Sequence, residues 1–94
     1  MSDLQITHNT SARRFEAMVD GQLCEASYRL KDGVMHIVHT GVPAALQGRG
    51  LAAELVVAAL AHAREQGWRV RPVCSYVAAY MRRHPDTQDL LETP

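Results

Sequence analysis

Residues 34–67 read VMHIVHTGVPAALQGRGLAAELVVAALAHAREQG, and this stretch decides the fold. Its first part, Val34–Val42, is rich in β-branched residues, which favour an extended strand. From Gly50 to Gln66, apolar residues recur at every third or fourth position, as in an amphipathic helix that packs on a sheet. Gly67 marks the helix end, because glycine adopts the left-handed cap conformation at little cost. The sequence thus predicts a strand, a glycine-rich loop and a helix in succession.

The residues before Val34 predict an antiparallel meander. Apolar and polar residues alternate in Arg13–Val19 and in Gln22–Leu30, which is the period of half-buried strands. Asp20-Gly21 and Lys31-Asp32-Gly33 supply the tight turns between neighbouring strands. A short strand over Leu4–His8 is expected to precede the meander.

Extended structure is expected to resume after the helix, over Trp68–Cys74. Pro72 cannot donate a ladder hydrogen bond, so this strand should lie at an edge or beside a gap. Ser75–His84 predicts a short second helix, ended by Pro85. The segment 86–94 is polar and is expected to be loosely ordered, as are residues 1–3. The whole chain, 1–94, is predicted to be one domain with an α+β (mixed α/β) fold.

Composition narrows the class of protein. The chain has 94 residues, and ten basic residues balance ten acidic ones, which argues against a partner such as nucleic acid or an anionic membrane. No segment has the length of a membrane span, and the start lacks the pattern of a signal peptide. A cytoplasmic location is therefore expected, with Cys24 in the core and both Cys24 and Cys74 as free thiols. No metal-ligand spacing is present, and we expect a monomer or a weak dimer.

The loop between strand and helix predicts an anion site. Gly48 and Gly50 leave backbone N–H groups open where a helix begins, and the helix dipole adds positive charge there. Arg49 either adds a direct cationic contact or points to solvent. The spacing matches neither a Walker A loop nor a dinucleotide fingerprint. On spacing alone, the glycines could equally form only a tight turn.

The motif Gln47-Gly48-Arg49-Gly50-Leu51-Ala52 resembles the Gln/Arg-x-x-Gly-x-Gly/Ala signature of the GNAT superfamily, the acyl-CoA-dependent N-acetyltransferases. The stretch from Val34 to Asp86 is also similar to a minimal GNAT-like subfamily with the layout HT-x-V-P, GRG-x-(A/G), C-x-(Y/F)-V and RRHP. This resemblance implies a GNAT-like fold and acetyl-CoA or coenzyme A as cofactor. It implies that N–H groups from Gly48 to Ala52 hold the pyrophosphate. It further implies that the strand end Thr40-Gly41-Val42 pairs with the pantetheine arm, and that the next strand splays away near Pro72.

Three residues are candidates for catalysis. Cys74 precedes a helix, which favours a thiolate that acts as nucleophile or acid; the alternative is a packed core thiol. In GNAT enzymes a tyrosine in the corresponding helix faces the CoA sulfur. The resemblance therefore points to Tyr80, and less strongly to Tyr76, as a proton donor, with a packing role as the alternative. His39 could accept the amine proton directly or through water; the alternative is a surface histidine or one that supports the site without touching the ligand. Its odd spacing from His36 predicts that the two rings lie on opposite faces of the strand.

The function expected from these features is transfer of an acetyl group from acetyl-CoA to the primary amine of a peptide, a protein or a small molecule. The expected partners are a CoA thioester and an amine acceptor. Two alternatives stay open: a module that binds CoA without turnover, and an interaction domain in which the glycine loop is only a turn.

Overall fold

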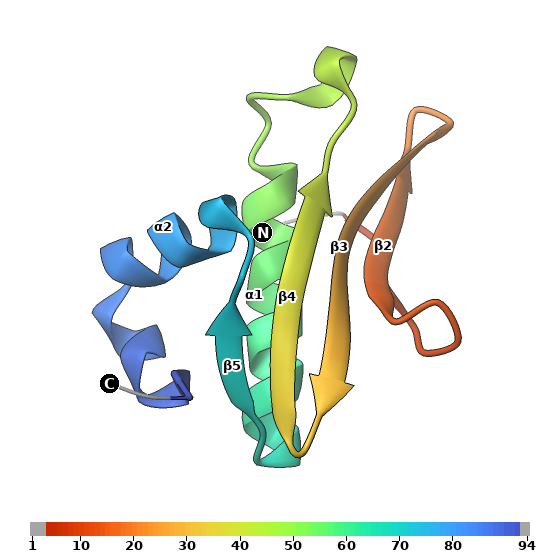
Figure 1. The fold of residues 1–94 in the computed structure, drawn as a ribbon. Helices are drawn as coiled ribbons and strands as arrows, with labels where there is room; N and C mark the ends of the chain where they lie inside the picture. The colour runs from red at the N-terminus through yellow and green to blue at the C-terminus, as the bar shows by residue number, and fades with distance from the viewer. Residues whose placement is uncertain (1–3, 93–94) are drawn as a thin grey trace.

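A five-stranded sheet, in the order β1-β2-β3-β4-β5, forms the centre of the fold (Figure 1). The computed structural model describes residues 4–92. The strands are β1 Thr7–Asn9, β2 Arg14–Val19, β3 Gln22–Lys31, β4 Val34–Gly41 and β5 Arg69–Pro72. The helices are α1 Leu51–Gln66 and α2 Ser75–Arg83, with 3-10 helices η1 Ala44–Leu46 and η2 Pro85–Leu90. The predicted meander, main helix and second helix are confirmed, and the fold is mixed α+β.

Two tight turns set the antiparallel register of β2, β3 and β4. Asp20 and Gly21 have φ values of 51° and 74°, and Asp32 and Gly33 have φ values of 51° and 76°. Positive φ at both central residues gives a turn whose twist matches the twist of the flanking strands. The Asp-Gly pairs therefore form the hairpins that the sequence predicts.

The connection from β4 to β5 runs through helix α1 and makes these two strands parallel. Gly67 ends the helix with φ 73°, and its N–H donates to the carbonyl oxygens of Ala63 and Arg64. The β4–β5 register begins at Val34↔Arg69 and ends at Ile37↔Pro72. Pro72 is thus the last paired residue of an edge strand, as its missing donor requires.

The core lies between α1 and one face of the sheet. Helix α1 contacts β2, β3, β4 and β5, and it lies behind them in Figure 1. Side chains from both layers are fully buried there, among them Cys24, Met35, Ile37, Leu55 and Val56. Cys24 is a core residue, as expected. No helix formed by residues 4–92 covers the opposite face of the sheet, which is turned toward the viewer in Figure 1.

The first strand lies later in the chain than the sequence predicts. The ladder with β2 pairs Thr7 with Glu16 and Asn9 with Arg14, so β1 includes only the end of the expected Leu4–His8 strand. Leu4 and Ile6 pack against the core as partly buried side chains without belonging to this ladder. Apolar burial, rather than strand pairing, therefore explains the apolar residues before Thr7.

The prediction of a loose tail is wrong for residues 86–92. Thr87 and Leu90 are buried, and the Thr87 hydroxyl donates to the His84 carbonyl oxygen at 2.7 Å. Asp89 accepts two hydrogen bonds from the Arg64 guanidinium, at 2.6 and 3.0 Å. Leu91 then forms a parallel bridge with Val70 on β5. Residues 1–3 and 93–94, for which loose order was also expected, lie outside the described residues.

Candidate functional site

The glycine loop leaves a run of backbone donors open at the start of helix α1. Gly48 and Gly50 have φ values of 85° and 75°, a left-handed conformation that favours glycine. The first hydrogen bond of the helix runs from the Glu54 N–H to the Gly50 carbonyl oxygen at 3.2 Å. Within residues 4–92, the N–H groups of Gly48–Ala53 have no backbone acceptor. Such a run at the positive end of a helix dipole suits an anion.

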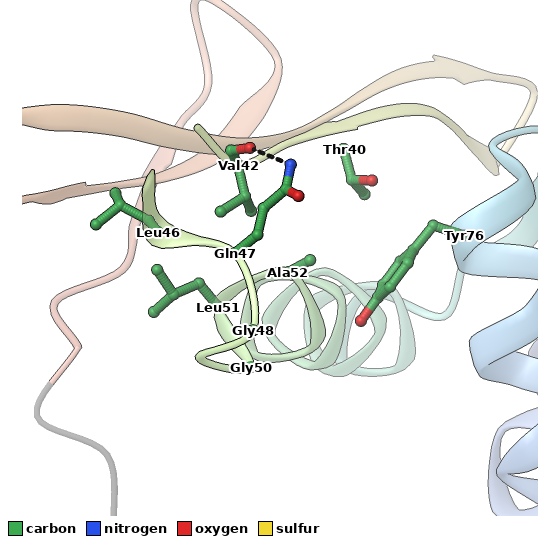
Figure 2. Close-up of a pocket in the computed structure, with 9 residues that line it drawn as sticks. All are labelled: Thr40, Val42, Leu46, Gln47, Gly48, Gly50, Leu51, Ala52 and Tyr76. Carbon is green, nitrogen blue, oxygen red and sulfur yellow. Dashed lines mark hydrogen bonds between the residues drawn. The ribbon is translucent and has the colours of Figure 1, made fainter. Parts of the chain in front are cut away.

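These donors border a hollow of about 430 Å³ (Figure 2). The hollow is lined by the end of β4, the loop, the first turn of α1 and one ring from α2: Thr40, Val42, Leu46, Gln47, Gly48, Gly50, Leu51, Ala52 and Tyr76. The Gln47 side-chain amide donates to the Val42 carbonyl oxygen at 3.1 Å, which ties the loop to the end of β4. A Cβ placed on Gly48 or Gly50 meets no atom of the protein within 4 Å. A side chain at either position would therefore project into open space that a ligand can use.

Strands β4 and β5 part on the side of this hollow. Their ladder ends at Ile37↔Pro72, and the Cys74 N–H then donates to the Ile37 carbonyl oxygen at 2.9 Å. From Val38 to Gly41, no strand of the described chain pairs with β4 on its β5 side. An extended polar chain can use such an open edge as a strand partner. The parting confirms the position near Pro72 that the sequence resemblance implied.

Cys74 lies between the parted strands and helix α2. Its thiol is 3.7 Å from the Thr40 hydroxyl. Cys74 is also the N-cap residue of α2, and its side chain makes no capping hydrogen bond. Burial acts to raise the pKa of this thiol. Interactions with the backbone of Val77, the Thr40 hydroxyl and the backbone of Tyr76 outweigh burial, so the pKa lies below its ordinary value. The structure therefore favours thiolate character at a half-buried cysteine beside the hollow.

The two tyrosines of α2 lie in different places. The Tyr76 ring is 40% exposed and lines the hollow, and in Figure 2 its hydroxyl points toward the helix α1 side. Tyr80 instead stacks on the ring of His84, at a centroid distance of 3.9 Å, and borders a separate hollow formed with α1 and η2. Burial, and then the negative charge of Asp86, raise the pKa of Tyr80. Tyr76 ranks below Tyr80 in the sequence-based prediction, whereas Tyr76 is the one of the two that lines this hollow. Its position two residues after Cys74, in the first turn of α2, is the signal that it lies beside the parted strands.

A β-bulge overturns the prediction that His36 and His39 lie on opposite faces. The β3–β4 register pairs Ser27 with His39 but Tyr28 with Ile37, so Val38 is an extra residue on β4. Residues paired across a ladder share a face, and Ser27 and Arg29, the partners of the two histidines, are two residues apart. Both rings therefore lie on the face opposite α1. His39 is exposed, and its Nε2 would be 3.0 Å from a Cβ built on Gly41.

Two residues of the predicted cofactor set do not line the hollow. Gly41 pairs with Glu25 at the end of β4, between Thr40 and Val42, which do line it. The Arg49 guanidinium donates to the Asp20 carboxylate at 3.1 Å, so this side chain turns toward the β2–β3 hairpin. Both side chains of that pair are more than half exposed. Such an ion pair contributes at most about 1 kcal/mol to the free energy of unfolding.

The part of the chain that is described contains neither a metal site nor a membrane-spanning helix. Over residues 4–92, no group of three or more histidine, cysteine or acidic side chains could hold a metal ion. No helix in the same range is long and apolar enough to cross a membrane. The glycine loop and its hollow are therefore the best-defined candidate for a ligand.

Known proteins resemble this chain in sequence and in fold. Residues 14–90 match the profile of the GCN5-related N-acetyl-transferase family. Protein NATD1 of Xenopus tropicalis is 30% identical over 93 residues, covering 95% of this chain and 84% of its own length. Protein NATD1 of Gallus gallus is 29% identical over 90 residues, covering 93% and 82%. A solution structure of a GCN5-like candidate N-acetyltransferase from Staphylococcus aureus superposes with a TM-score of 0.77 at 30% identity, covering 97% of this chain and 90% of that one. The chain therefore belongs to the GCN5-related N-acetyltransferase family.

Proposed function

We propose that this protein binds acetyl-CoA and transfers its acetyl group to a primary amine. The observation that carries the proposal is the run of open N–H groups from Gly48 to Ala53 beside the hollow. A pyrophosphate accepts several such hydrogen bonds at once and complements the helix dipole. Any helix start leaves about four N–H groups without an intrahelical partner; here the run extends back through Arg49 to Gly48 and lies beside the hollow.

The chain's residues fit the parts of this ligand. The N–H groups of Gly48–Ala52 hold the pyrophosphate, and the strand end Thr40–Val42 offers its open edge to the amide-bearing arm. When bound, the ligand supplies an activated thioester at the end of that arm. The parting of β4 and β5 leads the arm from the loop toward Cys74 and Tyr76.

Each candidate catalytic residue has a role that its position supports. Tyr76 lines the hollow, and its hydroxyl is our preferred proton donor to the leaving thiolate, with Tyr80, the sequence-based candidate, as the comparison. The Cys74 thiol has a lowered pKa and lies beside the Thr40 hydroxyl. We propose that it acts in the transfer as nucleophile or acid. His39, on the face of the sheet opposite α1, is proposed to accept the proton of the incoming amine.

Ligand binding is tested by thermal unfolding with acetyl-CoA, free CoA or ATP. A ligand at a hundred times its Kd stabilises the fold by about 2.7 kcal/mol. We expect both CoA species to raise the Tm and ATP to have a much smaller effect. No increase with either CoA species at millimolar concentration would contradict the proposal.

A pair of glycine variants locates the binding site. Gly50→Val places a β-branched side chain at φ 75°, and Gly67→Val imposes the same backbone conflict at φ 73° at the other end of α1. Each should destabilise the fold by about 1–2 kcal/mol. Only Gly50→Val should abolish the increase in Tm with acetyl-CoA. If both variants lost the increase in Tm with acetyl-CoA to the same extent, the glycine loop would be only a turn.

Turnover separates an enzyme from a module that only binds CoA. We expect release of free thiol from acetyl-CoA that depends on an added amine. Tyr76→Phe and Cys74→Ala should slow this release while leaving the ligand-induced increase in Tm intact, and Tyr80→Phe should have a smaller effect. Binding without any amine-dependent release would identify a non-catalytic module.

A further inference from the structure

The face of the sheet opposite α1 carries positive charge next to the point where β4 and β5 part. The register places Arg29, His36 and Arg71 in one row across β3, β4 and β5. The adjacent row contains Lys31, Val34 and Arg69. His36↔Arg71 is the pair immediately before Ile37↔Pro72, the last pair of the ladder. The first row, which we call the arginine row, therefore borders the parting itself.

This charge is only partly compensated. Arg71 pairs with Glu92 at 2.7 Å and keeps 54% of its side-chain surface exposed. Arg29 is exposed, and no ion pair joins it to any residue from 4 to 92. The acidic residues farther along this face, Glu16 and Glu25, both pair with Arg14. A chain with no net charge thus presents a positive surface at one end of one face.

We propose that this surface docks an acidic polypeptide segment that carries the acceptor amine. The inference rests on the proposed function, because it identifies the class of acceptor for the same site. The hollow proposed to take the CoA ligand is lined by β4, the loop and the helices, and the opposite face of the sheet is turned toward the viewer in Figure 1; we infer that the acceptor reaches the parting from that face. A segment that approaches from there passes over the arginine row, and His39 lies on the same face.

The dimensions of the row suit an extended chain. Neighbouring strands lie about 4.8 Å apart, so the Arg29 and Arg71 backbones are separated by roughly 10 Å. Alternate side chains of an extended peptide are about 7 Å apart, which long arginine side chains can match. Arginine also binds carboxylates through two hydrogen bonds, and it offers no amine that a nearby thioester could acetylate. The cations that border the parting can therefore hold an acceptor without competing with it.

An acidic polypeptide fits this surface better than a nucleic acid does. The two rows contain no Phe, Tyr or Trp on which a base could stack. Nucleic acids also lack the aliphatic amine that the proposed transfer needs. Displacement of a bound acidic peptide by an oligonucleotide at lower concentration than by the same peptide unlabelled would overturn our choice.

The direct test measures binding of three short peptides by fluorescence anisotropy, with and without acetyl-CoA. Each peptide is blocked at both ends and has one central lysine, flanked by glutamate, glutamine or arginine. The glutamate peptide should bind about tenfold more tightly than the glutamine peptide, which corresponds to two exposed ion pairs. High salt should remove the difference. Equal binding of the two, or tighter binding of the arginine peptide, overturns the inference.

Charge-neutralising variants locate the docking surface. Arg29→Gln removes a row member with no ion-pair partner in residues 4–92, and Arg13→Gln is the matched control near β2, away from β4 and β5. Arg29→Gln should raise the KM for the glutamate peptide about threefold to fivefold with kcat unchanged, and Arg13→Gln should change neither. An equal effect of both variants contradicts a local docking surface.

The two proposals fail in different ways. If acetyl-CoA raises the Tm and all three peptides are acetylated equally, the transferase function stands and the docking surface falls. If the glutamate peptide binds through Arg29 but no ligand-induced increase in Tm is found, the binding of an acidic segment stands, and its role as acceptor falls together with the transferase function.

Discussion

The hydroxyl of Thr40 lies 3.7 Å from the thiol of Cys74 and joins the end of strand β4 to the start of helix α2. This contact spans the place where the sheet opens, because β5 has already left β4 at Pro72. One residue lines the ligand hollow, and the other begins the helix that delivers Tyr76 to it.

Removal of the Thr40 hydroxyl should raise the pKa of Cys74, because the thiolate loses a hydrogen-bond donor. The isosteric variant Thr40→Val tests this without a large change in volume. The pH midpoint of alkylation of Cys74 by iodoacetamide, followed by mass spectrometry, should lie below that of a free thiol in the wild type and move upward in the variant. Cys24 is 0% exposed and should stay unlabelled in the folded protein. An unchanged midpoint would mean that Thr40 does not tune the thiol.

Release of Arg49 should strengthen binding of the CoA ligand. Asp20→Asn removes the charge that holds the guanidinium at 3.1 Å, so that Arg49 can approach the phosphates. The expected decrease in the Kd for acetyl-CoA is about twofold to fivefold, the scale of an exposed ion pair. Titration calorimetry measures it. Asp32→Asn is a close control, because Asp32 has the same φ of 51° in the other hairpin. A similar change in both variants would indicate an effect of hairpin conformation instead.

Stability should decline below pH 6.5 because of His8. This ring stacks on Phe15 and contacts the Tyr28 hydroxyl at 2.5 Å. Burial, and then the charge of His62, lower its pKa from the ordinary 6.5. The unfolded chain therefore binds a proton that the folded chain does not. The contribution of His8 to the free energy of unfolding is fully present above pH 6.5 and is lost as the pH falls through the folded pKa. Urea unfolding on both sides of pH 6.5 should show a weaker decline in His8→Gln, and equal declines would contradict this assignment.

The C-terminal segment should contribute to stability as a core element. Leu90 is 5% exposed, so Leu90→Ala should lower the free energy of unfolding by about 3 kcal/mol. Leu30 on β3 is 39% exposed, and Leu30→Ala should change it by no more than about 0.5 kcal/mol. Urea unfolding compares the two. Equal small effects would mean that η2 adds little to the fold in solution.

The order of the elements could be predicted because local signals agreed with the tertiary structure. The Asp-Gly pairs form the hairpins, Gly67 ends α1, and Pro72 lies on an edge strand. Each of these residues acts mainly through its own backbone geometry. Such signals are present in the sequence without knowledge of distant partners.

The errors arose where distant contacts decide the structure. Val38 is an ordinary β-branched residue, and only its register against Ser27 and Tyr28 makes it a bulge that turns His39 to the face of His36. Leu90 lies in a polar stretch, and its burial depends on helix α1 and on the pair of Arg64 with Asp89. The places of Tyr76 and Tyr80 likewise could not be told apart from sequence, because only the packing of α2 sets Tyr76 beside the hollow.

The hairpin that joins β3 to β4 also bears on self-modification. Lys31 is the only lysine of the chain, and it pairs with Val34, the first residue of β4. The glycine loop follows the other end of that eight-residue strand, so roughly 23 Å of extended chain separates the two. The single ε-amine therefore lies far from the loop that is proposed to hold the pyrophosphate, although it belongs to the row next to the arginine row at the parting. Because no other lysine is present, an acetyl mark on any lysine of the purified protein identifies this position, and the dependence of its rate on protein concentration distinguishes transfer within one molecule from transfer between two.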